Sequence, residues 1–162
     1  MLIEMQKEFF NSLPDEKIGH VCFEPMIPVY QNGIRNHSSQ DAQEFKAKFY
    51  KSLSPGQRAL FGFFTFYDHA VRSENEFQRI INLYLSGEFF TIVKKGAEYF
   101  SVEDKHDLLL DIEKTYTEHS EKQNYRVDEL FDRLLEISPQ TLAQIGVFIK
   151  ENPVEFVSFT LI

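Results

Sequence analysis

The sequence predicts an all-α, single-domain bundle over residues 1–162, with about seven to eight helices around a buried aromatic central helix at 55–72. Three observations lead to this prediction. Helix-start signatures recur along the chain, apolar residues follow each start at helical spacing, and one segment is apolar on all sides. A chain of this length buries roughly 70% of the surface that it exposes when unfolded, so it can build its own core.

The helix-start signature is a small polar residue followed by Pro at the first helical position or by Gln or Glu three residues later. It occurs at residues 54–57, 73–76 and 152–155, with weaker variants beginning at Ser38, Ser101 and Ser138. Apolar residues follow with a period near 3.6, as amphipathic helices require. Further helices are predicted around 127–135 and 142–149.

The segment 60–67 differs from the amphipathic helices, because its aromatic side chains project around the whole helix circumference. A helix that is apolar all round is buried. We therefore expect the helix at 55–72 to lie at the centre of the bundle, with its aromatic residues serving core packing.

Residues 14–37 have the least regular pattern, with three prolines and the pair Asn32-Gly33, which favours a two-residue turn. We expect an irregular N-terminal arm here, either a short hairpin or an extended segment lying over the bundle. The apolar tail 154–162 is expected to form a short helix and then an extended end.

Composition and sequence start favour a cytoplasmic protein. Cys22 is the single cysteine, which excludes an intramolecular disulfide and a cysteine-based zinc cluster and suits a reducing compartment. Acidic residues interrupt the N-terminus before a secretory signal can develop. The longest uncharged apolar run, 59–67, is shorter than the ~20 residues of a membrane-spanning helix, so no membrane association is expected.

The negative charge is concentrated in residues 98–136, which carry 12 acidic and 5 basic side chains of a chain with net charge −8. The acidic residues expected to bind a partner from the outer faces of two helices are Asp104, Asp107, Asp111, Glu118, Asp128, Glu129, Asp132 and Glu136. Such a field repels phosphate backbones and attracts basic proteins, so we expect a basic protein partner and no direct nucleic-acid binding. The alternative is a solvated face that keeps the protein soluble.

Two groups of residues suggest a metal-binding or a catalytic site. Glu103 and His106 have the i, i+3 spacing of carboxylate-bridged metal sites, but the second Glu-x-x-His of such sites is missing from the sequence. Tyr67, Asp68 and His69 place an acid and a base at the edge of the core, where proton transfer is conceivable. Adjacent helical residues point in different directions, however, and an ion pair between Asp68 and Arg72 is the simpler interpretation. We expect no cofactor and no metal.

Residues 53–61, the run Tyr67-Asp68-His69-Ala70 and the pattern Ser73-x-x-Glu76-Phe77 resemble uncharacterised proteins of Bacillus-type bacteria. More distantly, they are similar to the helical bacterial family named for a DNA-mimic protein. The Asn-Gly-Gly turn of that family is replaced here by residues 72–75. The resemblance implies an acidic, all-helical protein that binds another protein, with no catalytic residue to carry over.

The leading hypothesis is a non-enzymatic interaction domain, of a regulatory, inhibitor or immunity-like kind, that presents its acidic face to a basic partner. One alternative is a small helical hydrolase or metal-dependent enzyme using Asp68 and His69, or Glu103 and His106. Another is a structural module whose exposed aromatic residues form a homodimer.

Overall fold

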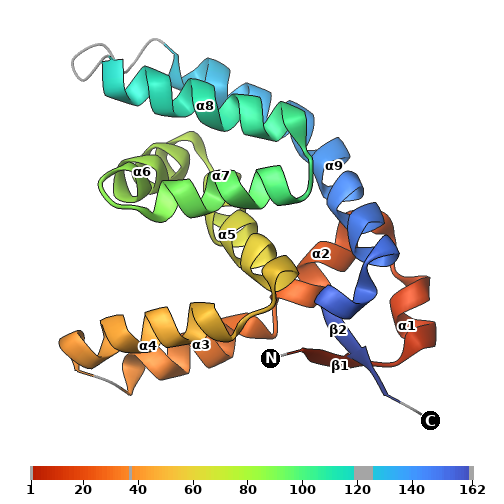
Figure 1. Ribbon diagram of the computed structural model, residues 1–162. Coiled ribbons are helices and arrows are strands. Elements are labelled where there is room, and N and C mark those ends of the chain that lie inside the picture. The colour runs from red at the N-terminus through yellow and green to blue at the C-terminus, as the bar shows by residue number, and fades with distance from the viewer. Residues whose placement is uncertain (1, 37, 119–125, 161–162) are drawn as a thin grey trace.

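The computed structural model describes residues 2–36, 38–118 and 126–160, and it confirms the predicted all-α bundle (Figure 1). Its helices are α1 (Lys7–Ser12), α2 (Asp15–Phe23), α3 (Met26–Arg35), α4 (Ser39–Ser52), α5 (Pro55–Ala70), α6 (Glu74–Leu85), α7 (Phe89–Tyr99), α8 (Glu103–Glu118), α9 (Val127–Glu151) and the short 3₁₀ helix η2 (Pro153–Glu155). The strands are β1 (Ile3–Met5) and β2 (Val157–Phe159). Within these described ranges, no helix is both long and apolar enough to cross a membrane.

The central helix is α5, as predicted, although it ends at Ala70 instead of residue 72. Ser54 and Gln57 form the expected capping box, in which each backbone N–H is bound by the other residue's side chain at 3.1–3.2 Å. Phe63, Phe64 and Phe66 are fully buried. They are covered by α2, α6 and α7, all of which pack against α5.

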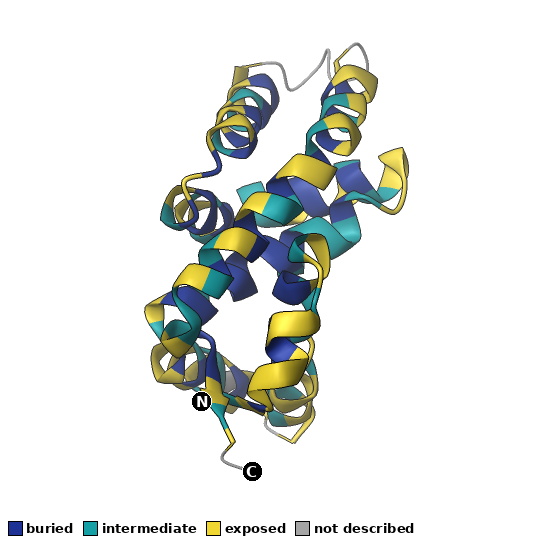
Figure 2. Ribbon diagram, turned by 90° about the vertical axis from the view of Figure 1, so that its right-hand side faces the viewer, coloured by how far each residue is buried: buried dark blue, intermediate teal, exposed yellow. Residues whose placement is uncertain are grey.

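The remaining helices surround this centre (Figure 1). Helices α8 and α9 lie side by side along one edge of the molecule, α3 and α4 form a hairpin that extends from the other end, and α9 continues down to pack on α2. Figure 2 shows that the buried residues lie on the inner sides of these helices and the exposed ones on the outer sides. The bundle is therefore built from amphipathic helices around one apolar one.

The expected irregular arm at 14–37 is wrong over the described residues, because Asp15–Phe23 and Met26–Arg35 form α2 and α3, while residue 37 lies outside the described ranges. The prolines misled the prediction. Pro14 and Pro25 occupy the caps before the two helices, and Pro28 lies in the first turn of α3. Backbone N–H groups have no intrahelical partner at these positions, so proline is tolerated there.

The expected hairpin turn at Gly33 is also wrong, since Gly33 lies inside α3. A β-carbon at this position would lie 1.8 Å from the ring of Phe45 on α4. The glycine therefore serves the close approach of α3 and α4, and no turn conformation is required.

The two helices predicted at 127–135 and 142–149 are one continuous helix, α9, which contains Pro139. Ser138 does not cap a new helix; its hydroxyl donates to the carbonyl of Leu134. Proline removes one backbone hydrogen bond and bends a helix without ending it when both halves are held by packing. Figure 1 shows α9 changing direction along its course, with one part packed on α8 and the other on α2.

The chain ends meet in a parallel pair of short strands, in which Ile3 is paired with Val157 and Met5 with Phe159. The extended end of the tail, preceded by the short helix η2, agrees with the sequence expectation. Its pairing partner was not predicted, because a strand of three residues is too short to show alternation.

Lys105 on α8 is the largest departure from a purely apolar core. Its side chain is only 1% exposed, and its Nζ has no hydrogen-bond partner within the described part of the chain. The amine lies 5.3–5.5 Å from the ring centres of Phe63, Phe66 and Tyr67. Burial lowers the pKa of Lys105 to about 7, although the ring faces favour its charged form.

We predict that Lys105→Met stabilises the protein near neutral pH, by about 1–3 kcal/mol, because a buried amine is replaced by an apolar side chain of similar size. The folded-state pKa lies below that of the unfolded chain, so the unfolded state holds more protons from about pH 7 to about pH 10. The Lys105 contribution to stability therefore improves as pH rises. Urea denaturation at pH 7, 8, 9 and 10 should show the advantage of Lys105→Met shrinking, and a constant difference would contradict this account.

Candidate functional site

A groove of about 370 Å³ lies between α2, α3, α5 and α6. Its aromatic lining combines the half-buried rings of Tyr30 and Tyr84 with the buried rings of Phe23, Phe61 and Phe64 behind them, which are at most 4% exposed. Ligand sites in proteins have volumes of roughly 300–1,000 Å³ and combine apolar walls with a few polar groups. The groove falls in that class.

The spacing of residues on α5 explains why the groove has an aromatic and a polar part. Phe61 and Phe64 are three residues apart and Asp68 follows four residues later, so all three share one face of the helix. Thr65 and His69, four residues apart, form the adjacent stripe, and Arg72 follows three residues later, just beyond the end of α5; all three also line the groove. The helix thus changes from apolar to ionisable along a single face.

Asp68 is held by His20 of α2, whose Nε2 lies 2.7 Å from Oδ1 of Asp68. The other ring nitrogen of His20 lies 3.6 Å from Glu24. The hydrogen bond to Asp68 raises the pKa of His20, against the opposing effect of burial. The expected ion pair between Asp68 and Arg72 is not formed among the residues that the structure describes.

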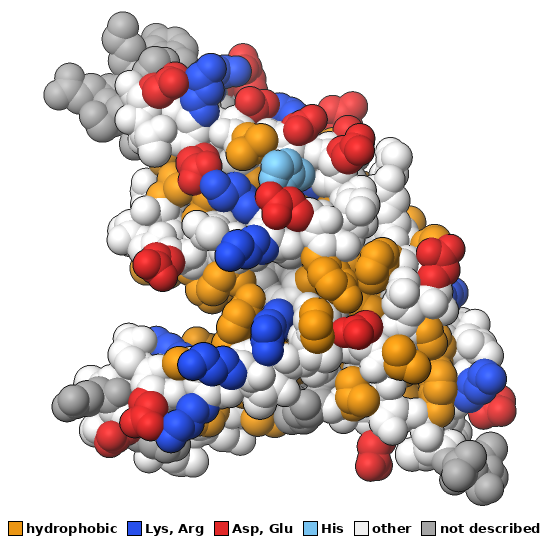
Figure 3. All heavy atoms as spheres, in the orientation of Figure 1, with side chains coloured by type: hydrophobic (Ala, Val, Ile, Leu, Met, Phe, Trp, Pro, Cys, Tyr) orange, Lys and Arg blue, Asp and Glu red, His pale blue; other side chains and the backbone are white. Residues whose placement is uncertain are grey.

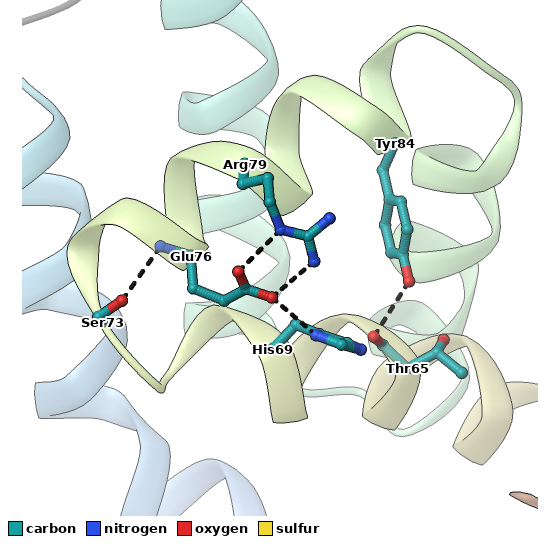
Figure 4. A network of polar contacts seen from close by, with 6 residues as sticks. All are labelled: Thr65, His69, Ser73, Glu76, Arg79 and Tyr84. Atoms are coloured by element: carbon teal, nitrogen blue, oxygen red, sulfur yellow. Dashed lines mark hydrogen bonds and ion pairs between the residues drawn. The ribbon is translucent and has the colours of Figure 1, made fainter.

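His69 is held by Glu76 of α6, at 2.8 Å between Nδ1 and Oε1 (Figure 4). Two nitrogens of Arg79 donate hydrogen bonds to the same carboxylate, at 2.6 and 2.8 Å. The Glu76 backbone N–H is capped by the hydroxyl of Ser73. Hydrogen bonds from Arg79 first, and then from His69, lower the pKa of Glu76 to about 2, so the carboxylate stays charged.

The other nitrogen of His69, Nε2, points toward the side of Thr65 and Tyr84 in Figure 4, and both of these residues line the groove. Nε2 has no hydrogen-bond partner among the described residues. The Tyr84 hydroxyl donates to the carbonyl of Thr65 at 3.0 Å, and burial raises the pKa of Tyr84 to about 12. His69 therefore lines the groove with one ring nitrogen bound to Glu76 and the other free to bind a ligand.

The sequence candidates Tyr67, Asp68 and His69 do not form one cluster. Tyr67 stacks on Phe63 with ring centres 5.4 Å apart and is absent from the lining of the groove. Asp68 is hydrogen-bonded to His20, and His69 is hydrogen-bonded to Glu76. Each of the three side chains has its own neighbours, as the helical geometry of adjacent residues requires.

In the candidate metal pair of Glu103 and His106, the imidazole of His106 is bound to a different glutamate. Its Nε2 lies 3.1 Å from Glu98 on α7. Glu98, Glu103 and His106 all line a shallow depression of about 340 Å³. Over the described ranges, no group of three His, Cys, Asp or Glu side chains is arranged to hold a metal ion.

The eight acidic candidates of α8 and α9 fall into two sets. Asp111 pairs with Arg133 across the two helices, and Glu129 lies 3.9 Å from Arg126. The remaining six are exposed and form no ion pair with another described residue: Asp104, Asp107, Glu118, Asp128, Asp132 and Glu136. Figure 3 shows acidic side chains gathered along the edge formed by α8. The uncompensated charge is thus smaller than the sequence suggests.

No family model, curated protein or solved structure matches this chain. The resemblance at residues 53–78 stays a prediction. The sequence did not reveal the lining residue Tyr84, nor His20 and Glu76, which bind the groove residues Asp68 and His69. The spacing of Glu76 and Arg79 signals an ordinary helix-surface pair, and His20 lies 48 residues from its partner Asp68.

We predict that Asp68→Asn destabilises the protein more at pH 5.5 than at pH 9. The pKa of His20 is raised in the folded state, so its pairing with Asp68 stabilises the fold below the unfolded pKa of ~6.5, and this stabilisation is lost as pH rises through the folded pKa. Because His20 is more than one third exposed, solvent screening limits the effect to about 1 kcal/mol at pH 5.5. Urea denaturation at both pH values measures it, and an equal loss at both would refute the assignment. Glu24→Gln, at the longer distance, serves as the weaker control.

Proposed function

We propose that the protein binds a small aromatic molecule in the groove between α2, α3, α5 and α6. The observation that carries the proposal is the combination of aromatic lining residues with Asp68, His69 and Arg72 in one concavity of about 370 Å³. Aromatic side chains favour offset or edge-to-face contacts with another ring, worth about 0.5–1.5 kcal/mol per pair beyond the area that is buried. A flat ring is the ligand shape that the half-buried rings of Tyr30 and Tyr84 suit best.

The packing of the groove supports binding without a large ordering cost. Phe23, Phe61 and Phe64 are at most 4% exposed, and they also contact one another, so their positions are set before a ligand arrives. A ligand that buries about 200 Å² of apolar surface gains about 5 kcal/mol. Association costs at least about 4 kcal/mol in lost translational and rotational freedom, so we expect weak binding, with a dissociation constant of about 1 mM or higher.

The binding proposal is tested by filling the groove. We predict that Thr65→Trp abolishes the binding of indole and naphthalene probes, while Leu83→Trp, at a site 55% exposed on α6 and outside the groove lining, leaves it intact. Amide NMR shifts during titration measure both affinity and location, with changes expected around Thr65, Asp68 and His69. Absence of saturable shifts in the native protein, or shifts confined to another face, would exclude the groove as a site.

A second candidate function is docking to a basic protein through the outer faces of α8 and α9. It is favoured by the six carboxylates that no described basic residue neutralises. Uncompensated charge of one sign raises the association rate with an oppositely charged surface and makes that rate sensitive to salt.

The docking proposal is tested by charge reversal. We predict that changing Asp104, Asp107, Asp128 and Asp132 together to Lys abolishes the salt-sensitive capture of a basic protein from native lysate. A matched control reverses four exposed acidic residues outside α8 and α9: Glu8, Glu16, Glu24 and Asp41. Equal loss with the control indicates a general charge effect, and retention by both variants would refute docking through α8 and α9.

A further inference from the structure

We infer that the groove is also a catalytic site, in which His69 acts as a general base that activates water to hydrolyse the ester of a small aromatic acid or phenol. This inference rests on the proposed function, because it places an aromatic substrate in the same groove. It assigns an activity to the open nitrogen of His69 and a positioning role to Glu76 and Arg79.

The tautomer of His69 follows from its hydrogen bond. A charged carboxylate only accepts hydrogen bonds, so Nδ1 must carry the hydrogen that it shares with Glu76 at 2.8 Å. In the neutral ring, the lone pair is then on Nε2, the nitrogen on the Thr65 and Tyr84 side. This is the arrangement that a general base requires, with one nitrogen held and the other available.

The carboxylate is itself held so that it orients His69 without taking its proton. Arg79 donates two hydrogen bonds to Glu76 from the same helix, and the Ser73 cap fixes the backbone of that turn. The turn between α5 and α6 therefore carries the whole arrangement, with His69 on one side and Glu76 and Arg79 on the other (Figure 4). The side chain of His69 is 38% exposed, so water reaches it.

Water is the nucleophile because the hydroxyl groups of the groove lining are bound or kept protonated, since burial raises the pKa of both Tyr30 and Tyr84. The hydroxyl of Thr65 donates to the carbonyl of Phe61 within α5. The thiol of Cys22 is fully buried, and burial raises its pKa to about 12. Neither side chain is placed or ionised for attack.

The reaction balances as follows. Nε2 of His69 takes a proton from water as the water oxygen forms a bond to the ester carbonyl carbon. The carbonyl electrons move to oxygen, and the negative charge that develops there is favoured by the guanidinium of Arg72, which lines the same groove. When the bond from the carbonyl carbon to the alkoxy or phenoxy oxygen breaks, the imidazolium returns its proton to the leaving oxygen. The products are a carboxylic acid and an alcohol or phenol.

The inference is tested with phenyl acetate and p-nitrophenyl acetate as substrates. General-base catalysis contributes typically 10²–10⁴-fold, so we expect His69→Gln to lower kcat at least 10-fold. His106→Gln is the matched control, because His106 also pairs with a glutamate but lies outside the groove. Glu76→Gln should lower kcat with KM unchanged, which distinguishes positioning of the base from substrate binding. Equal rates for the native protein and His69→Gln would overturn the inference.

A second measurement does not depend on activity or on a variant that folds. Long-range nitrogen–proton NMR of the native protein at pH 8.5 reports which ring nitrogen of His69 carries the hydrogen. We expect the Nδ1–H form, and the Nε2–H form would overturn the inference. If the indole and naphthalene probes bind the groove but the Nε2–H tautomer or unchanged His69→Gln kinetics are found, the catalytic inference is refuted and the binding function stands. If no probe binds the groove, the proposed binding function is itself refuted.

Discussion

The structure depends on the burial of the aromatic residues of α5. Phe63, Phe64 and Phe66 are fully buried, and each contributes roughly 1.5–3 kcal/mol when it is removed from water. No single neighbour covers all sides of a helix that is apolar around its circumference, so α2, α6 and α7 must each cover one part of it. The arrangement of the bundle follows from that requirement.

The candidate site is a consequence of the same helix. Its buried rings Phe61 and Phe64 lie behind the groove that α5 lines together with α2, α3 and α6. Toward its C-terminal end Asp68 and His69 replace aromatic residues on the groove side, and Arg72 follows just after the helix. Core packing and an ionisable groove thus involve neighbouring faces of one helix. Lys105 shows the opposite situation, in which an amine is enclosed by the rings of α5 and pays the cost of desolvation.

The sequence misjudged those places where a residue type has more than one structural use. Pro14 and Pro25 looked like breaks in regular structure but occupy helix caps, and Pro139 bends α9 without ending it. Gly33 looked like a turn residue but provides room for Phe45 of the next helix. Proline at a cap and proline in a loop look alike in sequence, and for Gly33 and Pro139 the deciding contacts come from other helices.

The sequence by itself determined the all-α class, the capping box at Ser54 and Gln57 and the buried central helix, because these depend on interactions within a few residues or on the apolar character of one segment. The order of ionisable residues along α5 was equally visible. Only the tertiary structure decided the partners of those residues: His20 reaches Asp68 from 48 positions away, and Glu76 meets His69 across the turn between α5 and α6. Such contacts depend on the angle at which two helices pack, which is set by the whole core and is not encoded in the spacing along either helix.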